Sequence, residues 1–129
     1  MKINMEKANK MSCSHIGLQI TANDLRRFYI ECLGGEIIEE KELERERAFD
    51  IFCISKDIKV IYVRVGNILL ELFVHHDETQ NSFNHLCIVA DDIISIRNQC
   101  QKYHYPVIDS NHKFFTKDNN GNTFEILHH

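Results

Sequence analysis

Alternation of apolar and polar residues marks much of the chain as short strands. In residues 12–20, Ile16, Leu18 and Ile20 are apolar, and glycine or polar side chains stand between them. A period of two residues is typical of a strand with one buried face. Alternation, or a short β-branched and aromatic run, predicts further strands at residues 36–43, 58–65, 67–74, 84–90, 106–110, 112–117 and 122–128.

Two segments repeat their apolar residues at the period of a helix instead. The first covers residues 21–35, and either Thr21 or Asn23 is expected to cap its start. Its apolar face consists of Leu25, Phe28, Cys32 and Leu33. The second covers residues 91–105, and its inward face consists of Ile93, Ile96, Cys100 and Tyr103.

The order of these elements repeats halfway along the chain. A strand, a helix and three strands occupy about residues 12–74, and the same series occupies about residues 84–127. "HIGLQI" in the first half corresponds to "HLCIVA" in the second, and "GNILLEL" corresponds to "GNTFEI". Both similarities occur in the same order. We therefore predict one α+β domain of two similar modules, preceded by an N-terminal tail of residues 1–11.

Four predicted strands each carry one histidine or glutamate opposite their apolar face. These residues are His15, Glu71, His85 and Glu125. Glu71 lies inside the apolar run from Ile68 to Val74, where an uncompensated carboxylate would cost several kcal/mol. The two helices can cover the apolar faces, so the opposite faces are expected to line a concavity. Two imidazoles and two carboxylates there suit a divalent cation (Ni, Co, Zn, Mn or Fe), whose charge would compensate Glu71.

Composition limits the kinds of partner that such a site can have. The chain has 129 residues and a formal net charge of −4 without a basic stripe, so we expect no nucleic-acid partner. Five cysteines, an odd number, indicate reduced thiols rather than a disulfide framework. No apolar run approaches the ~20 residues of a membrane helix, and the polar first residues do not form a secretory signal. We expect a cytoplasmic protein that binds a small molecule and no membrane.

Several other residues are expected to have ordinary structural roles. Cys13 and Cys87 flank the two histidines and are interpreted as small core side chains. The remaining histidines are expected to be solvated, with a pocket-lining role as the alternative for two of them near turns, His104 and His112; the others are His75, His76, His128 and His129. The mixed-charge run from Glu39 to Arg47 favours a solvated strand end or loop. The alternative is a segment over the site whose Arg45 or Arg47 meets an anionic substrate.

Together these motifs resemble the vicinal oxygen chelate superfamily, and within it glyoxalase I (lactoylglutathione lyase). The similarity covers residues 12–127. It rests on the two strand openings that begin with a histidine, and on two further stretches, "FYIECLGGEI" and "DNNGNTFEIL". Members have two βαβββ modules that form a cupped mixed sheet around one metal, with the helices on the outer face. The ligand positions of glyoxalase I match His15, Glu71, His85 and Glu125.

The resemblance implies a metal-dependent lyase. Glyoxalase I isomerises the hemithioacetal of a 2-oxoaldehyde to a thioester, with the metal stabilising the enediolate as a Lewis acid. A ligating carboxylate moves the carbon-bound proton. The resemblance implies that Glu125 is the first candidate for this base and that Glu71 is a ligand or a second base. It also implies a homodimer, and it leaves open whether the metal site lies within one chain or is shared between two.

The sequence departs from bacterial glyoxalase I at positions that bind glutathione. Residues 16–19 contain no arginine, and the asparagine expected shortly after Glu71 is absent. The basic residues before the last turn are only Lys113 and Lys117. Another thiol, or a different small substrate with adjacent oxygens, therefore fits equally well.

Other functions of the superfamily remain as alternatives. A non-catalytic antibiotic-binding protein of the bleomycin-resistance type generally lacks the full metal set, so Glu71 and Glu125 argue against it. A fosfomycin-type thiol transferase uses two histidines and one glutamate, which makes Glu71 the discriminating residue. An extradiol dioxygenase uses three iron ligands and usually a longer chain. An epimerase of the methylmalonyl-CoA type stays open.

Overall fold

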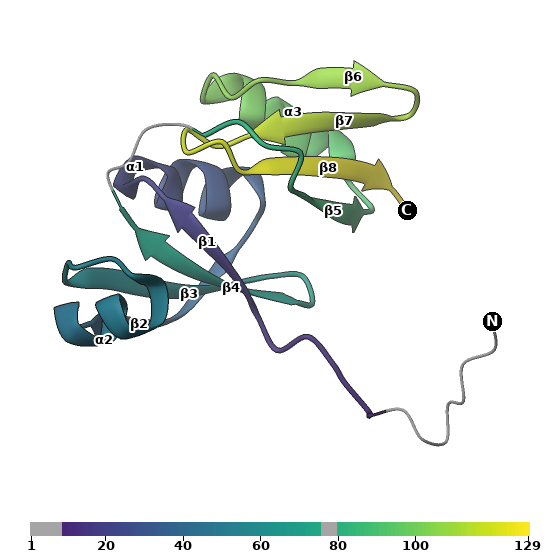
Figure 1. The fold of residues 1–129 in the computed structure, drawn as a ribbon. Coiled ribbons are helices and arrows are strands. Elements are labelled where there is room, and N and C mark those ends of the chain that lie inside the picture. The colour runs from purple at the N-terminus through teal and green to yellow at the C-terminus, as the bar shows by residue number, and fades with distance from the viewer. Residues whose placement is uncertain (1–8, 76–79) are drawn as a thin grey trace.

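Two modules of similar topology make up the computed structural model, which describes residues 9–75 and 80–129 (Figure 1). The first contains β1 (Ile16–Ile20), α1 (Ala22–Asp24), η1 (Leu25–Cys32), β2 (Glu36–Leu43), α2 (Arg45–Phe52), β3 (Ile58–Val65) and β4 (Ile68–Val74). The second contains β5 (His85–Ala90), α3 (Ile93–Lys102), β6 (Ile108–Ser110), β7 (Lys113–Lys117) and β8 (Thr123–His128). The predicted α+β class and its repeated order are confirmed.

Each module forms its own four-stranded sheet. The strand orders are β1-β4-β3-β2 and β5-β8-β7-β6. β1 is parallel to β4 and β5 is parallel to β8, while the other neighbours are antiparallel. The first strand of each module is therefore an edge strand, and the glutamate-bearing strand lies beside it. Among the strands of the described residues, the two sheets are not hydrogen-bonded into one continuous cup.

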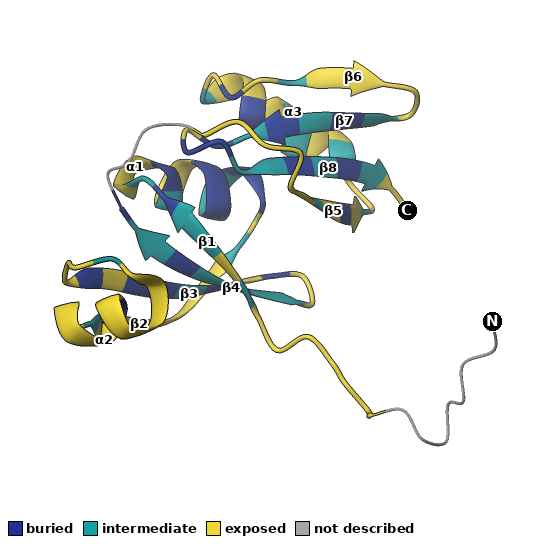
Figure 2. Ribbon diagram, in the orientation of Figure 1, coloured by how far each residue is buried: buried dark blue, intermediate teal, exposed yellow. Residues whose placement is uncertain are grey.

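A single apolar core joins the two sheets. Leu70 and Leu72 of β4 and Phe124 and Ile126 of β8 are at most 1% exposed, as their alternation predicts. They belong to one cluster with the buried residues of η1 and α3, and these two helices pack on each other. Figure 2 shows the buried positions gathered on the strands and helices that face this core. The apolar face of each sheet is thus covered from within the chain.

The first predicted helix has an unusual form. A short α-helical turn leads into a π-helix, in which the N–H of Leu33 donates to the carbonyl of Phe28, five residues back. The wider turn buries Phe28 and Tyr29 together, although only Phe28 was expected on the inner face. Thr21 occupies the N-cap position but its side chain makes no capping hydrogen bond. The second helix, α3, is capped by Asp92, whose carboxylate accepts from the N–H of Ser95.

A buried acidic network ties the two modules together. Asp24 of α1 is fully buried and accepts hydrogen bonds from the Tyr105 hydroxyl and from the backbone and side-chain amides of Asn119. Asp118, 4% exposed, accepts from the Tyr29 hydroxyl at 2.6 Å. Burial raises the pKa of the Asp118 carboxyl, and hydrogen bonds from Asn122 and Tyr29 act in the opposite direction. Each carboxylate therefore connects a helix of the first module to the β7–β8 turn of the second.

The mixed-charge run is ordered, and its interpretation as a strand end or loop is only partly right. Residues 39–43 belong to β2, and residues 45–47 begin α2, a helix that the charge pattern concealed. α2 ends at Cys53, which adopts a left-handed backbone conformation with φ 60°. The module therefore carries one helix beyond the predicted order. No helix among residues 9–75 and 80–129 has both the length and the apolar character to cross a bilayer.

Candidate metal centre

The first histidine and glutamate form a pair across β1 and β4. His15 immediately precedes β1, and Glu71 is the middle residue of β4, with Gly17 as its register partner. His15 Nε2 and Glu71 Oε1 are 3.7 Å apart. Glu71 Oε2 accepts a short hydrogen bond from the hydroxyl of Tyr62, which faces it from β3. The Glu71 side chain is 16% exposed, so its charge is partly buried and partly supported by a neutral donor.

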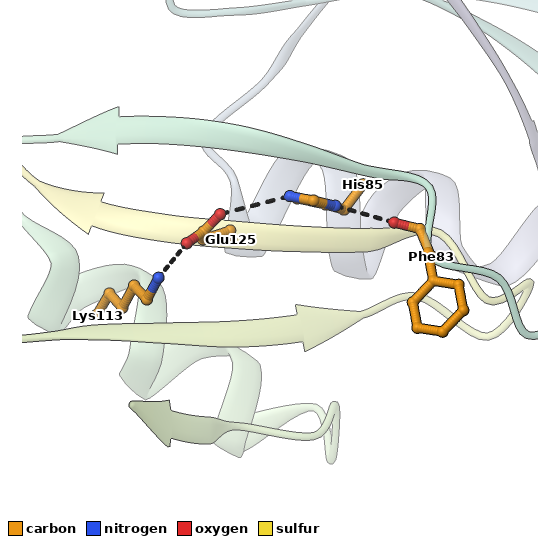
Figure 3. Close-up of polar contacts among 4 residues, drawn as sticks. All are labelled: Phe83, His85, Lys113 and Glu125. Atoms are coloured by element: carbon orange, nitrogen blue, oxygen red, sulfur yellow. Dashed lines mark hydrogen bonds and ion pairs between the residues drawn. The ribbon is translucent and has the colours of Figure 1, made fainter. Parts of the chain in front are cut away.

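The second pair has the same form in the second sheet (Figure 3). His85 opens β5, and its Nε2 lies 3.5 Å from Oε1 of Glu125 in β8. Glu125 Oε2 accepts from the Lys113 ammonium at 2.5 Å. His85 Nδ1 lies 3.0 Å from the carbonyl oxygen of Phe83. One carboxylate oxygen of each glutamate is thus held by a neighbouring strand, while the other faces an imidazole.

Strand register explains why the two pairs match. Gly17 is the register partner of Glu71, and Cys87 is the partner of Glu125. Each of these partners lies two residues after a candidate histidine, so His15 and His85 occupy the same place relative to their glutamates. The spacing from glycine to glutamate differs by one residue between "GNILLEL" and "GNTFEI". That difference does not disturb the pairs.

The hydrogen bond at Nδ1 of His85 fixes what can stand between its ring and Glu125. A carbonyl oxygen only accepts hydrogen bonds, so the Nδ1 that contacts Phe83 carries the hydrogen. In a neutral ring Nε2 is then an acceptor, and it faces a carboxylate oxygen, which is also an acceptor. Two acceptors at this distance repel each other unless a proton on the ring or a metal ion stands between them. Fixing of Nδ1 by a backbone carbonyl is the usual support of a metal-binding histidine.

The donor set fits a divalent metal of the first transition row. Atoms bound to one cation at about 2.0–2.2 Å stand roughly 3–3.5 Å apart, close to the two nitrogen–oxygen distances. Tyr62 and Lys113 hold the remaining carboxylate oxygens, which is the role of residues that orient metal ligands. Imidazole and carboxylate donors suit Ni, Co, Mn, Fe or Zn better than they suit a closed thiolate site.

The two glutamates differ in the charge of their supporting residue. The Lys113 ammonium beside Glu125 lowers the pKa of that carboxyl below its ordinary value. Glu125 is therefore ionised throughout the neutral range. The Glu71 carboxylate, as hydrogen-bond acceptor, raises the pKa of Tyr62 to about 12, so this phenol stays protonated and keeps donating.

The two pairs do not meet within one chain. In the described ranges 9–75 and 80–129, no group of three or more histidine, cysteine, aspartate or glutamate side chains is placed to hold a metal. The physical reason lies in the core, because both sheets turn their apolar faces to it. The faces that carry Glu71 and Glu125 both point away from that core. A single chain therefore presents two separate histidine–glutamate pairs, the candidate half-sites.

Two expectations about neighbouring residues are wrong. His75, expected to be solvated, is 5% exposed, because its N–H extends the β1–β4 ladder by donating to the carbonyl of Ile20. His76 lies outside the described residues. Cys13 and Cys87, interpreted as core side chains, are exposed, since they share the outward faces of the candidate histidines. The other described histidines, at positions 104, 112, 128 and 129, are exposed as expected.

α2 covers part of the face that carries Glu71. Its Phe52 ring packs edge-on against Phe73 of β4, with ring centroids 5.2 Å apart. A cleft of about 210 Å³, the α2 cleft, remains between this helix and the sheet. The residues of interest in its wall are Ile51, Phe52, Val60, Tyr62, Glu71 and Phe73. Arg45 and Arg47, considered as contacts for an anionic substrate, are exposed and do not line it.

Comparison with known proteins identifies the fold. No protein-family model matches the sequence, and no curated protein matches it significantly. Among solved structures, the fosfomycin resistance protein FosX from Listeria monocytogenes matches with a TM-score of 0.70 and 12% identity, covering 92% of this chain and 91% of that one. FosX from Mesorhizobium loti matches with the same TM-score and identity, covering 92% of each chain. A Bacillus anthracis protein described as a glyoxalase family member matches with a TM-score of 0.60 and 18% identity, covering 94% and 98%.

Two of the FosX structures are complexes. One Listeria structure contains Mn(II) and a sulfate ion. A variant of the same protein was solved with Mn(II) and 1S,2S-dihydroxypropylphosphonic acid. At 11–13% identity, the FosX likeness supports the fold of this chain.

Proposed function

We propose that the protein is a metal-dependent enzyme of the vicinal oxygen chelate superfamily that acts on a small substrate with adjacent oxygens. The observation that carries the proposal is the matched pair of half-sites, each with an imidazole Nε2 facing a carboxylate oxygen. The fold shared with FosX and with a glyoxalase family protein supports it, because the FosX structures include Mn(II) complexes.

A homodimer completes the site in this proposal. β1 and β5 are edge strands, so each can pair with a strand of a second chain. Twofold pairing of β1 with the partner's β5 would place His15 and Glu71 beside His85 of the partner subunit and Glu125 of the partner subunit. By symmetry the dimer holds two such sites. The exposed histidines, 41% and 44% by side chain, are the groups that this pairing would cover.

The proposed reaction is a proton transfer between adjacent carbons, of the glyoxalase I type. The bound metal would polarise the two substrate oxygens and stabilise negative charge on them. Glu125 or Glu71 takes the proton from the carbon that bears both the hydroxyl and the sulfur, and returns it to the neighbouring ketone carbon. The hydroxyl proton passes to the former ketone oxygen, so the hydroxyl carbon becomes the thioester carbonyl, the former ketone carbon becomes an alcohol, and the step is redox-neutral overall.

Metal analysis combined with an isomerase assay tests this function. We expect about one Ni, Co, Mn, Fe or Zn ion per subunit after purification or metal addition. Methylglyoxal is then offered with glutathione, cysteine or coenzyme A, and thioester formation is followed by ultraviolet absorbance. Less than about 0.1 equivalent of metal, with no rescue by any of these ions, would contradict the metal site. Full metal without thioester formation from any thiol would exclude the lyase reaction alone.

Fosfomycin modification is a second candidate, favoured by the likeness to FosX at a TM-score of 0.70. The ligand in one FosX complex differs from fosfomycin, an epoxide, by one molecule of water. Metal-loaded protein is therefore incubated with fosfomycin, with and without a thiol, and followed by phosphorus NMR. A new resonance without thiol indicates addition of water, and one that requires thiol indicates thiol transfer. An unchanged spectrum rejects this candidate.

Replacing Glu125 with glutamine separates binding from catalysis. The amide keeps one oxygen near His85 but accepts no proton from carbon, so we expect metal content within about threefold of wild type and at least about a hundredfold loss of turnover. Metal content is measured by emission spectrometry and turnover with the substrate found above. Unchanged turnover would assign the proton transfer to Glu71 or to a group that is not a ligand.

A further inference from the structure

We propose that the α2 cleft is a specificity subsite that takes an aliphatic or aromatic substituent of the metal-bound substrate. This inference rests on the proposed function, since it assigns the part of the substrate that lies beyond the adjacent oxygens. The substrate class becomes a molecule with two adjacent oxygens joined to an apolar group of about the size of a phenyl ring.

The wall of the α2 cleft combines apolar side chains with Glu71 of the candidate metal centre. Ile51 and Phe52 of α2, with Leu43, Val60 and Phe73 of the sheet, form the apolar part of the wall, and Lys41 and Glu42 of β2 also line the cleft. Glu71 and Tyr62 line the same cleft. A ligand held at Glu71 therefore lies directly against this apolar wall. A mainly apolar wall combined with a small number of polar groups is the usual composition of a small-molecule site.

α2 leaves its large apolar side chains poorly packed. Only Ala48 of this helix is buried, while Phe49, Ile51 and Phe52 are about half exposed. A helix that serves only to close the core would bury its large apolar residues. Phe52 and Ile51 instead remain available to cover a further apolar group. Burying such a group removes apolar surface from water on both partners and favours its binding.

The volume of the α2 cleft is large enough for a ring-sized group. An apolar cavity of about 150 Å³ is known to hold benzene, so about 210 Å³ admits a ring-sized substituent. A second cleft of about 220 Å³ adjoins the first across the Phe52–Phe73 contact and contains Leu18, Ala48 and Ile58. A longer aliphatic chain can therefore continue past Phe52. Gly17 allows this arrangement, since a Cβ there would lie 3.3 Å from the Phe73 ring.

Two hydroxamic acids test the subsite on metal-loaded protein. Acetohydroxamic and benzohydroxamic acids chelate metals through the same adjacent oxygens and differ only in a methyl or phenyl substituent. We expect benzohydroxamate to bind at least about tenfold more tightly by calorimetry. Phe52→Ala should reduce this preference to about threefold or less and leave acetohydroxamate affinity within about twofold. Phe49→Ala, on the same helix but outside the cleft, is the control and should keep the full preference.

A metal-free experiment separates this inference from the proposed function. Benzene is titrated into the metal-free protein, and methyl resonances of Ile51 and Val60 are followed by NMR. Shifts at both methyls support the cleft even if no metal binds, in which case only the proposed function fails. Equal affinity for the two hydroxamates in the wild type, or a preference that survives Phe52→Ala, overturns the subsite while the metal site stands. Absence of benzene shifts also overturns the subsite, because another part of the protein would then fill the cleft.

Discussion

Replacing Glu71 with alanine is expected to lower the affinity for a divalent cation by at least about a hundredfold. Loss of a group that only orients a ligand typically costs roughly 10–100-fold in metal affinity, and loss of the ligand itself costs more. Glu71 provides the Oε1 that faces His15 and one of the two carboxylates of the proposed site. The measurement is competition against a chelator dye with Mn(II), Ni(II) or Co(II).

Two further variants calibrate this result. Tyr62→Phe removes only the hydrogen bond to Glu71 Oε2, so we expect a loss of roughly tenfold. Glu40→Ala removes an exposed carboxylate of β2 that pairs with Lys59, and it should leave metal affinity unchanged. Wild-type affinity in Glu71→Ala would show that this carboxylate is not a ligand and that its position in β4 has another cause.

Replacing Asp118 with alanine is expected to destabilise the protein by about 3 kcal/mol or more. Its carboxylate accepts hydrogen bonds from the Tyr29 hydroxyl, from the N–H groups of Asn120 and Asn122, and from the Asn122 side chain. Truncation removes the acceptor of these donors in a site that is 4% exposed, although the Asn122 amide keeps the carbonyl oxygen of Gln19 as a second acceptor. The free energy of unfolding is measured by urea denaturation of the metal-free protein.

A second substitution of Asp118 and one at another acidic position define the cause of that loss. Asp118→Asn retains one oxygen for the two backbone donors and should cost clearly less than alanine. Asp109→Ala breaks an exposed pair with Arg97 and should change stability by less than about 1 kcal/mol. Equal stability of Asp118→Ala and Asp109→Ala would contradict a structural role for the network between the modules.

Alternation along each strand carries reliable information because it is a local property. It correctly separated Leu70 and Leu72, which are buried in the core, from Glu71, which lies on the opposite face. The repeated order of elements likewise followed from short sequence stretches. Whether those residues bind a metal remains a prediction, since the sequence pattern places residues on faces but does not identify a ligand.

Features that depend on contacts between distant residues could not be predicted from the sequence. Asp24 and Tyr105 are 81 positions apart, and no local pattern indicates that a buried carboxylate and a tyrosine hydroxyl meet. α2 was concealed because its charged first turn suggests a solvated loop, and its apolar residues are only half buried. The outward direction of both candidate faces depends on how the two modules pack, which strand alternation does not determine.

The charge of Glu71 within an apolar strand is accommodated at two levels. In the single chain, the carboxylate is partly exposed and accepts from Tyr62. In the proposed dimer, a cation shared with three other ligands would compensate the remaining charge. The two histidine–glutamate pairs lie on separate sheets, so the described part of the chain contains no complete metal-binding cluster.

A mixed dimer tests the shared site most directly. One chain carries His15→Ala with Glu71→Ala, the other carries His85→Ala with Glu125→Ala, and differently tagged chains are co-expressed and purified as the heterodimer. If each site combines one half-site from each subunit, the heterodimer has one intact site, and we expect about one metal per dimer against about two in the wild type and none in either parent. A heterodimer that binds no metal, beside a wild type that does, would contradict the shared site.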